Sequence, residues 1–396
     1  MTKVYSPAMN KTISVDRIIA QIEGKKNGPT IVFFAGIHGN ETAGVFALEA
    51  VLKNFNSENT NGNIYAISGN LEALKINQRF LDKDLNRIWT KEQLQDLQYK
   101  NEFNSEEQEQ KELYGLLETI IKTNSGPFYF IDFHTTSSKT LPFITINDAL
   151  INRKFSKLFP VPIVLGIEEF LNGPLLSYIN ELGYVSLGFE SGQHDEQEAV
   201  ENCISFIYLV LVYAKLIEKE KLPAFDQYYS ELQTNAKHLS DIFEVVYLHR
   251  IRRNEVFKMM NGFQSFERVQ KGTSIAFSNN EVIKSTYNAR LFMPLYQTKG
   301  EEGFFIIRPI KPFFLKLSAA LRHLRFDGLL VLFPGISWEN KNKEALKVNL
   351  RVTKFFAKSI FHLLGYRNKK VDTTHLLLYN RERASKVKSY KKEGWY

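Results

Sequence analysis

The sequence predicts an α/β protein with a largely parallel sheet that is covered by helices on both faces. Over the first 220 residues, short β-branched or aromatic runs alternate with segments of helical periodicity. Strands that alternate with helices favour parallel pairing, because each crossover helix packs back onto a face of the sheet. Hydrophobic residues make up 44% of the 396-residue chain and charged residues 24%, the composition of a folded chain with a sizeable core.

The expected elements of this region are short strands in alternation with longer helices. The strand candidates are Ile18–Ile22, Thr30–Ala35, Asn63–Ser68, Phe128–Phe133, Val161–Leu165 and Tyr184–Phe189. The helix candidates are Thr42–Leu52, Lys91–Thr123 and Glu196–Glu218. The first helix has apolar residues at helical spacing, the second is polar and rich in Gln and Glu, and the third contains the longest apolar run of the chain.

A change of composition near residue 222 predicts three parts. We expect an α/β domain over residues 1–222, a smaller β-rich domain over 223–310 and a mixed, basic extension over 311–396. Glycines separate the strand candidates of the second part, which are Phe243–Leu248, Ser274–Phe277 and Phe304–Ile307. In the extension, helix-like stretches alternate with basic loops, and the two longest are Phe313–Leu324 and Val352–Leu364.

The composition also restricts the environment of the protein. Cys203 is the single cysteine, so an intrachain disulfide and a cysteine-based metal site are excluded. The apolar run Ile204–Ala214 is far too short to span a bilayer, and the N-terminus lacks the apolar core of a secretory signal. We therefore expect a cytoplasmic protein with no membrane span, and the sequence leaves a homo-oligomer open.

Positive charge is concentrated at the C-terminal end. The net charge of the chain is +8, and residues 351–396 hold 12 Lys or Arg against 3 Asp or Glu. We interpret this end as a solvated and partly frayed tail. The alternative interpretation is that it recruits the protein to an acidic partner or an anionic membrane. No recognition motif accompanies the charge, so no nucleic-acid partner is expected.

The strongest local signal is the segment Gly36-Ile37-His38-Gly39-Asn40-Glu41, which lies between the strand Thr30–Ala35 and the next helix. Open α/β sheets bind ligands outside the carboxyl ends of their strands. His38 and Glu41 are three residues apart in a turn that enters a helix, so both side chains can reach one point. Imidazole nitrogen and carboxylate oxygen are suitable zinc ligands. The alternative interpretation is a glycine-rich turn with Glu41 near the helix N-cap.

A second histidine ends another strand candidate. His134 follows Phe128–Phe133 and supplies the third protein ligand of a catalytic zinc site, which also keeps an open position for water. Asp132 points to the same side of the strand and can orient the imidazole of His134. A lone histidine at a strand end usually has a structural role, but His38, Glu41 and His134 together predict a site for one zinc ion per chain.

Two further segments contain groups that a zinc hydrolase needs. Glu190, within Gly188–Gly192, ends a third apolar strand and is suited to act as general base for water and then as acid for a leaving amine. The segment Arg79–Arg87 contains two guanidinium groups and an amide, which suit carboxylate binding and oxyanion stabilisation. The alternative interpretations are a strand-end glutamate at the surface and an exposed charged loop.

These motifs resemble the succinylglutamate desuccinylase/aspartoacylase family, which belongs to the zinc carboxypeptidase-like fold group. The resemblance covers roughly residues 16–310 and consists of four short motifs in the same order. They are His38-x-x-Glu41, Asp84-Leu85-Asn86-Arg87, His134 and Gly188-x-Glu190-x-Gly192. The resemblance implies a doubly wound mixed sheet, a smaller β-rich C-terminal domain that caps the site, and zinc bound by the two histidines and Glu41.

The resemblance also implies a role for individual residues. Glu190 corresponds to the catalytic carboxylate, and Arg79 to the arginine that stabilises the oxyanion. Asn86 and Arg87 correspond to the residues that hold the substrate carboxylate. Tyr296, in the β-rich domain, corresponds to a residue that lines the pocket.

One departure from the family pattern concerns the substrate. Aspartoacylases carry an additional substrate-binding arginine shortly before the catalytic glutamate, whereas this sequence has no Lys or Arg from Leu158 to Ala214. We therefore expect hydrolysis of the amide bond in an N-acyl amino acid or a similar small substrate with one carboxylate. The alternatives are a zinc carboxypeptidase or peptide amidase, and a catalytically inactive binding protein of the same fold.

Overall fold

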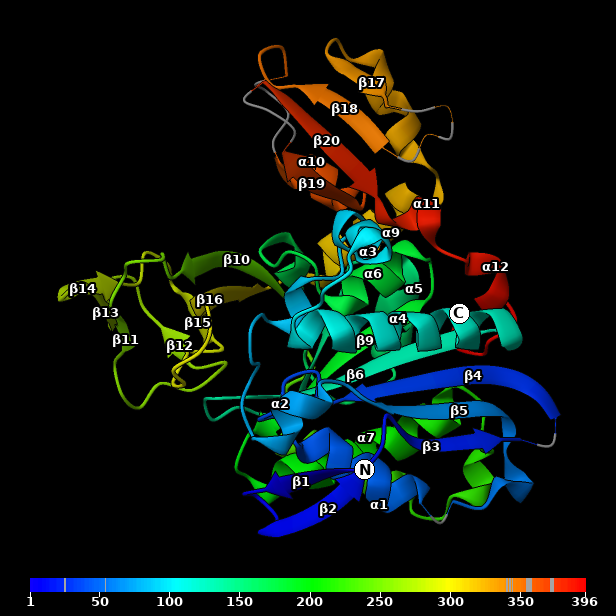
Figure 1. The fold of residues 1–396 in the computed structure, drawn as a ribbon. Coiled ribbons are helices and arrows are strands. Elements are labelled where there is room, and N and C mark those ends of the chain that lie inside the picture. The colour runs from blue at the N-terminus through cyan, green and yellow to red at the C-terminus, as the bar shows by residue number, and fades with distance from the viewer. Residues whose placement is uncertain are drawn as a thin grey trace.

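The computed structural model describes residues 1–396 apart from positions 25, 54, 340, 342, 344, 354–357 and 371–373. The centre of this described part is a mixed sheet of eleven strands with helices on both faces (Figure 1). Its strands are β3 (Ile18–Glu23), β4 (Lys26–Ala35), β5 (Asn61–Ser68), β6 (Phe128–Thr136), β7 (Phe143–Ile146), β8 (Ile163–Leu165), β9 (Val185–Gln193), β10 (Ile242–Arg250), β12 (Arg268–Val269), β15 (Ala289–Phe292) and β16 (Glu302–Pro309).

The middle of the sheet is parallel, as the sequence predicts. The spatial order is β12-β15-β16-β10-β8-β7-β9-β6-β4-β5-β3. Strand β4 pairs in parallel with β5 and β6, and β6 pairs in parallel with β9. Antiparallel pairing of β3 with β5 and of β7 with β9 makes the sheet mixed. The carboxyl ends of β4, β6 and β9 therefore meet at one edge of the sheet.

Two layers of helices cover this sheet. The core on one face includes residues of α1 (Ala43–Leu52), α2 (Leu71–Lys75), α5 (Leu150–Ser156), α7 (Gln197–Tyr213) and α8 (Phe225–Asn235). The core on the other face includes residues of α3 (Lys91–Tyr99), α4 (Ser105–Thr123) and α6 (Leu175–Glu181). Successive side chains of a strand point to opposite faces. In β4, Phe33 accordingly joins the first core and Phe34 the second, and both are fully buried.

The alternation of strands and helices predicted for the first 220 residues is confirmed, with one interruption. The expected helix Lys91–Thr123 is two helices, because residues 100–104 separate α3 from α4. A capping box explains the break: the Asn104 side chain accepts a hydrogen bond from the Glu107 backbone, and Glu107 accepts one from the Asn104 backbone. This reciprocal pair starts a new helix at Ser105.

The main sheet continues beyond residue 222. Strand β10 pairs in parallel with β8 and antiparallel with β16, so strands of the β-rich region extend the same sheet. A separate three-stranded sheet contains β11 (Phe257–Met259), β13 (Ser274–Ser278) and β14 (Glu281–Lys284), and β1 (Thr2–Ser6) and β2 (Lys11–Val15) form a hairpin. The division into three domains remains a prediction.

The C-terminal region forms a projecting lobe with its own small core (Figure 1). Its antiparallel sheet contains β17 (Ile336–Trp338), β18 (Ala345–Asn349), β19 (Tyr366–Lys370) and β20 (His375–Asn380). The helices of this region are α9 (Pro312–His323), η5 (Phe326–Leu332), α10 (Lys358–Leu363), α11 (Arg381–Ala384) and α12 (Val387–Tyr390). The helix expected over Val352–Leu364 corresponds in part to α10, and its positions 354–357 lie outside the described residues.

The expectation of a frayed, solvated C-terminal end is wrong for the last residues of the chain. Tyr390 is fully buried, and its hydroxyl donates to the carbonyl of Phe128 at 2.5 Å and accepts from the Val185 amide at 3.0 Å. Trp395 packs against the ring of Tyr129. The aromatic side chains between the basic residues bury this end against the α/β body. Within the described residues, no helix has the length and apolar character needed to cross a membrane.

Candidate metal centre and active site

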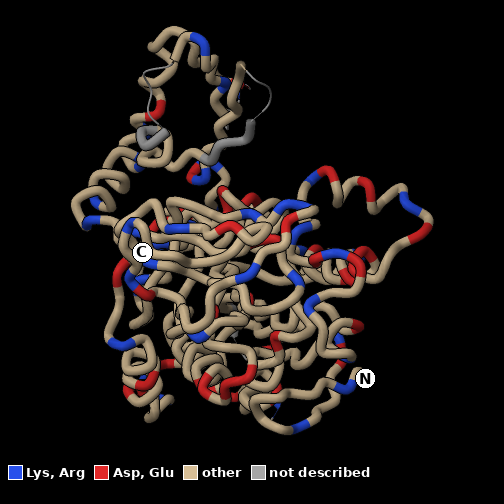
Figure 2. Tube along the Cα trace, turned by 90° about the vertical axis from the view of Figure 1, so that its left-hand side faces the viewer, with Lys and Arg blue, Asp and Glu red and all other residues tan. Residues whose placement is uncertain are grey.

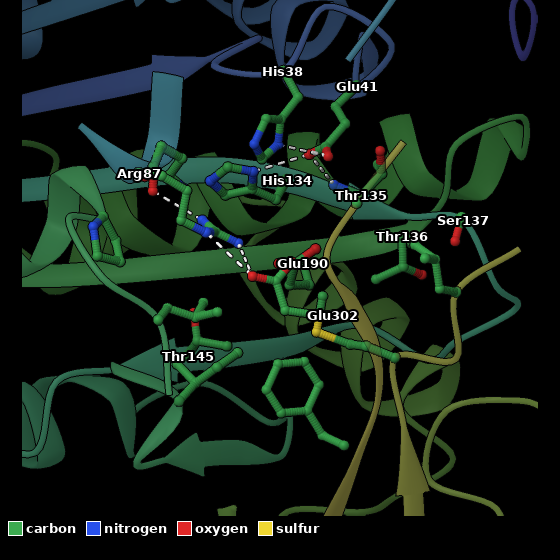
Figure 3. Close-up of a pocket in the computed structure, with 18 of the residues that line it drawn as sticks. His38, Glu41, Arg87, His134, Thr135, Thr136, Ser137, Thr145, Glu190 and Glu302 are labelled. Atoms are coloured by element: carbon green, nitrogen blue, oxygen red, sulfur yellow. Dashed lines mark hydrogen bonds and ion pairs between the residues drawn. The ribbon is translucent and has the colours of Figure 1, made fainter. Parts of the chain in front are cut away.

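Four candidate residues meet at the carboxyl ends of neighbouring strands (Figure 3). His38 and Glu41 follow β4, His134 lies near the end of β6, and Glu190 lies in β9. Strand β6 lies between the other two, and His134 is the register partner of Glu190. All four side chains are buried. The topology thus places the predicted ligands and the predicted base in one crevice.

Glycines shape the turn that carries His38 and Glu41. Gly36 has a φ of +70°, a left-handed conformation that favours glycine. A Cβ atom at Gly39 would collide with the backbone of Ala73, so only glycine allows this close approach. The Glu41 amide donates to the His38 carbonyl at 3.1 Å and tightens the turn. Helix α1 then begins at Ala43, which fixes Glu41 beside the histidine.

The side chains of His38, Glu41 and His134 converge. Glu41 Oε1 lies 2.8 Å from His38 Nδ1, and Glu41 Oε2 lies 2.9 Å from His134 Nδ1. The potential ligand atoms of the three residues all lie within 4.8 Å of one another. The Thr135 amide also donates to Glu41 Oε2 at 3.1 Å. Two imidazole nitrogens and one carboxylate oxygen are thereby held around one point.

A second carboxylate holds the far side of each imidazole. His134 Nε2 lies 2.7 Å from Asp132 Oδ2, as expected for the orienting role predicted for Asp132. His38 Nε2 lies 3.0 Å from Asp84 Oδ1, a contact the sequence did not reveal. Ligating histidines commonly donate their other ring N–H to a carboxylate, which fixes the tautomer. Both rings therefore have Nδ1 available for a metal ion.

The predicted ligands His38, Glu41 and His134 form a buried cluster of ionisable groups. Burial alone would raise the pKa of Glu41, but His38 and His134 hold that pKa well below its usual range. Burial would lower the pKa of His134, but Asp132 and Glu41 raise it well above the usual value. The carboxylates thus favour positive charge on the imidazole of His134. A divalent cation would supply that positive charge instead, so the donor set fits zinc.

Glu190 differs from the other carboxylates of the site. Its Oε2 atom is buried without a hydrogen-bond partner, and its side chain points into the pocket (Figure 3). Burial, together with the nearby carboxylates of Glu41 and Asp132, raises the pKa of Glu190 to about 8, although His134 and Arg79 oppose this rise. A carboxyl group that exchanges its proton near neutral pH suits general acid–base catalysis.

Arg79 lies directly beside the predicted metal ligands. Its Nη1 donates to Glu41 Oε1 at 3.3 Å, and its Nη2 donates to Asp84 Oδ2 at 3.0 Å. Burial would lower the pKa of Arg79, but these two carboxylates raise it. The guanidinium also lines the pocket, which is the position required of an oxyanion-stabilising group.

Asn86 and Arg87 also line the pocket, but both have protein partners. Asn86 Oδ1 accepts from the amide of Leu175, the first residue of α6, at 2.9 Å. Arg87 forms an ion pair with Glu302 of β16, with Nη2 3.1 Å from Oε1 (Figure 3). In this structure the guanidinium of Arg87, which is predicted to bind the substrate carboxylate, is therefore bound to the carboxylate of Glu302.

Tyr296 lies next to the pocket without lining it. Its hydroxyl donates to the Met260 carbonyl at 2.8 Å and accepts from the Phe263 amide at 3.0 Å. Its neighbours Leu295 and Gln297 do line the pocket. The contacts of Tyr296 thus direct its hydroxyl toward the β-rich region, and the predicted place of Tyr296 in the lining of the pocket is not found in this structure.

The pocket is a cleft that opens to solvent. One part of its wall is apolar and consists of Ile146, Ile167, Leu171, Leu176, Met293 and Phe305. Among the described lining residues, Arg79 and Arg87 are the only arginines, and lysine is absent. Both guanidinium groups already face carboxylates, so the pocket offers no further cation for a second substrate carboxylate.

Three residues of the site escaped the sequence analysis. Asp84 was noted only as part of a motif, and Glu302 carries no motif signal. The third is His194, which lines the pocket with Nδ1 2.7 Å from Thr135 Oγ1 and Nε2 3.3 Å from Gln297 Oε1. Burial lowers the pKa of His194. Its place in the sequence, two residues after Gly192 of a recognised motif, is the one signal that could have drawn attention to it.

The mixed sheet and the crevice at its carboxyl edge define a protein of the zinc carboxypeptidase-like fold. Residues 27–194 match the family described as Succinylglutamate desuccinylase/Aspartoacylase catalytic domain. Over these residues the chain is therefore similar to the catalytic domain of this family, as the sequence motifs predict.

Individual relatives agree with this assignment. A succinylglutamate desuccinylase of Photorhabdus laumondii is 37% identical over 88 residues, which cover 22% of this chain and 27% of that protein. A probable aspartoacylase of Acaryochloris marina is 33% identical over 128 residues, which cover 31% and 40%. The matches to these curated relatives thus span well under half of their length.

Solved structures extend the likeness of fold to most of the chain. A succinylglutamate desuccinylase/aspartoacylase from Rhodobacter sphaeroides superimposes with a TM-score of 0.57 and 15% identity, over 78% of this chain and 94% of that chain. A succinylglutamate desuccinylase from Vibrio cholerae gives a TM-score of 0.52 and 14% identity, over 78% and 91%.

Proposed function

We propose that this chain is a zinc-dependent amidohydrolase that removes the acyl group from a small N-acyl amino acid. The observation that carries the proposal is the buried set of His38, Glu41 and His134, whose ligand atoms lie within 4.8 Å of one another. Two imidazoles and one carboxylate, with a free position for water, form the ligand set of known catalytic zinc sites. Zinc held there supplies Lewis-acid chemistry to an amide carbonyl and a water molecule.

Glu190 is the proposed acid–base group. Its unpartnered Oε2 atom takes a proton from the attacking water, whose hydroxyl adds to the amide carbon. The same carboxyl then gives the proton to the nitrogen as the C–N bond breaks, so the products are a carboxylic acid and an amine, and the acid then loses its proton to the amine or to water. The elevated pKa of Glu190, about 8, suits a group that both accepts and returns a proton.

Two arginines are proposed to act on the substrate, one at the amide oxygen and one at the carboxylate. Arg79 is held by Asp84 and Glu41 at the edge of the ligand set, where it can stabilise the negative charge that develops on the amide oxygen. Arg87 can hold the substrate carboxylate once it releases Glu302. The backbone and side chain of Asn86 fix the loop that carries Arg87, since its amide donates to Asp84 and its Oδ1 accepts from Leu175.

The shape of the pocket favours a small substrate over a peptide. The loop before β16 contributes part of the wall through Met293, Pro294, Leu295 and Gln297. The alternative enzyme is a carboxypeptidase or peptide amidase, and such an enzyme needs a cleft long enough to hold several residues of a peptide substrate. An inactive binding protein is the second alternative, but each proposed ligand and the proposed base retain side chains that can perform the chemistry.

The charges of the wall also favour a substrate with one carboxylate. Arg79 and Arg87 are the only Lys or Arg side chains of the described wall and both already face carboxylates, so a second buried substrate carboxylate would lack a guanidinium or ammonium partner and would be strongly disfavoured. The apolar residues near the cleft instead suit a neutral or apolar side chain.

Metal analysis combined with a substrate panel tests this function. Protein loaded with zinc should contain about one zinc ion per chain and hydrolyse N-acetyl derivatives of neutral amino acids. For these, kcat/KM should equal or exceed that for N-acetylaspartate, and the amidated counterparts should be poor substrates. A clear preference for N-acetylaspartate would contradict the proposed charge selectivity. Failure to bind zinc would favour a binding protein.

A further inference from the structure

An apolar surface lies on the C-terminal region, away from the residues that line the pocket. Twenty large apolar side chains of the described residues are exposed, and seven of them fall within residues 313–333. We call these seven the apolar patch: Phe313, Phe314, Leu324, Phe326, Leu329, Leu332 and Phe333. Concentrated exposure of this kind marks an interaction surface rather than scattered surface hydrophobics.

Helix α9 presents one apolar face outward. Phe313, Leu317, Ala320 and Leu324 follow one another at helical spacing and form a stripe along the helix, and all but the half-buried Leu317 are exposed. The opposite face carries the buried residues Ser318 and Arg322. Helix α9 is therefore amphipathic, but its apolar stripe faces the solvent, whereas the apolar stripe of a core helix faces the protein interior.

Polar contacts fix this orientation. Arg322 donates to the Asp148 carbonyl and side chain at 2.6 Å each, and Ser318 donates to the Leu363 carbonyl at 2.7 Å. Asp148 belongs to the α/β body and Leu363 to α10 of the lobe. Element η5 carries Phe326, Leu329 and Leu332 of the apolar patch and packs against α9. The patch cannot turn inward without breaking buried hydrogen bonds.

The segment that carries the apolar patch exposes no carboxylate. Within residues 311–334, the exposed ionisable side chains are Lys311, Lys316, His323 and Arg325, and the acidic Asp327 is buried. Residues 311–396 as a whole hold 19 Lys or Arg against 6 Asp or Glu. In the α/β body, by contrast, both signs are interspersed (Figure 2). The partner of this surface must therefore be apolar and negatively charged.

We infer that the apolar patch and its basic rim bind an anionic lipid surface, with α9 lying along the interface. Amphipathic helices with Phe and Leu on one face and Lys or Arg beside it bind membranes in this way. Anionic headgroups attract the basic rim, and each Lys or Arg near the surface strengthens binding roughly fivefold. A second copy of the chain fits less well, because self-association through this patch would bring two sets of positive charges together.

Vesicle sedimentation with the full chain tests the inference. The protein should bind vesicles of phosphatidylcholine mixed with phosphatidylglycerol, and should bind pure phosphatidylcholine vesicles much more weakly. Added salt should weaken the binding, because it screens the attraction of the rim to the headgroups. Absence of binding to the mixed vesicles, or equal binding to both kinds, would overturn the inference.

Matched variants separate the apolar patch from general surface hydrophobicity. Leu324 and Val256 are each 72% exposed, and Val256 lies in the β-rich region far along the sequence from the patch. Leu324→Gln should weaken vesicle binding about tenfold or more, whereas Val256→Gln should leave it unchanged. Leu332→Gln, at a position 77% exposed, provides a second patch variant should Leu324→Gln disturb folding, which thermal melting reports. Equal losses in the patch and control variants would overturn the inference.

Two further readouts distinguish other partners. Sedimentation velocity should show no dimer that Leu324→Gln dissociates; such a dimer would assign the apolar patch to a second copy. Vesicles should compete with any acidic protein partner; binding of such a partner without vesicle binding would also refute the lipid assignment. Hydrolysis of a soluble N-acyl amino acid should be unchanged in the patch variants, because their residues do not line the pocket.

Discussion

Arg87 and Glu302 form an ion pair although 215 residues separate them in the sequence, with Nη2 3.1 Å and Nε 3.3 Å from Oε1. Both residues line the cleft, and both side chains are mostly buried. The pair joins the loop after Asp84 to the first residue of β16. If Arg87 binds the substrate carboxylate, the substrate has to displace Glu302, so Glu302 acts as an internal competitor.

This relationship predicts the effect of Glu302→Gln on substrate binding. The substitution removes the competing charge and leaves the guanidinium available, so KM for a monocarboxylate N-acyl amino acid should fall by roughly tenfold, the lower part of the 1.5–3 kcal/mol typical of hydrogen bonds to charged groups. The value of kcat should change little, because Glu302 does not take part in proton transfer. Steady-state kinetics on the zinc-loaded protein measure both constants.

Glu301→Gln is the matched control for that variant. Glu301 is adjacent in sequence but 77% exposed, and its partner is Arg250 rather than a residue of the cleft. KM should therefore stay at the wild-type value in Glu301→Gln. An unchanged or higher KM in Glu302→Gln would mean that the ion pair holds Arg87 in its binding position instead of competing with the substrate.

Replacing a predicted metal ligand should remove both zinc and activity. His134→Ala deletes one of the three donors, and even groups that only orient ligands contribute about 10- to 100-fold to metal affinity. Zinc affinity should therefore fall by at least ~100-fold, and hydrolysis should be nearly abolished. Metal analysis after gel filtration, together with an activity assay, checks both outcomes.

His238→Ala serves as the control because His238 is exposed and lies outside the cleft. This variant should keep one zinc ion per chain and wild-type turnover. Normal zinc content in His134→Ala would contradict the ligand assignment.

Glu190→Gln should separate catalysis from metal binding. The amide keeps the size of the side chain but cannot accept the proton of water, so the rate should fall by the ~10²–10⁴-fold typical of general acid–base catalysis. Zinc content should stay at the wild-type level, because Glu190 is assigned no ligand bond. Parallel zinc analysis and kcat measurement test this prediction. A variant that loses zinc would identify Glu190 as a ligand.

The sequence predicted the centre of the site because the topology of a parallel sheet makes strand ends converge. His38, His134 and Glu190 each follow or end an apolar strand candidate, and parallel strands bring such ends to one edge. The partners of these residues were less accessible. The contact of His38 with Asp84 spans 46 positions, and that of Arg87 with Glu302 spans 215, so both depend on tertiary packing that local patterns do not encode.

The fold likewise has features that local sequence patterns predict and features that depend on contacts between distant residues. Continuous apolar runs located β4, β6 and β9, because strands that are buried on both faces carry apolar residues without alternation. The sequence did not reveal that β10 continues the main sheet. Its pairing with β8 depends on which strand edge lies beside it in the folded protein, and local sequence patterns do not encode this. The excess of positive charge predicted a solvated C-terminus. In the structure the buried Tyr390 has more influence on the packing of this end than the surrounding lysines.

Asp148 connects the α/β body to the C-terminal region through a buried charge cluster. Its Oδ2 accepts from Arg153 Nη2 and from Arg322 Nη2, each at 2.6 Å. Burial would raise the pKa of Asp148, but the two guanidinium groups hold that pKa well below its usual range. Because the folded state lowers the pKa, ionised Asp148 stabilises the protein at pH values above about 3.9, the pKa of an unfolded aspartate.

Asp148→Asn should therefore lower the free energy of unfolding at neutral pH by about 3–5 kcal/mol, because it leaves two buried arginines without their counter-charge. The difference from the wild type should shrink as the pH falls below about 4, because the unfolded wild-type chain then binds a proton at Asp148 while the folded protein still holds the carboxylate ionised. Urea unfolding at neutral and acidic pH measures both effects. Asp226→Asn is the control: Asp226 is 84% exposed and pairs with Lys219 at the surface, so its loss should change stability by less than about 1 kcal/mol. A pH-independent difference between Asp148→Asn and the wild type would mean that the arginines are stabilised by other partners, such as the carbonyl groups that Arg322 also contacts.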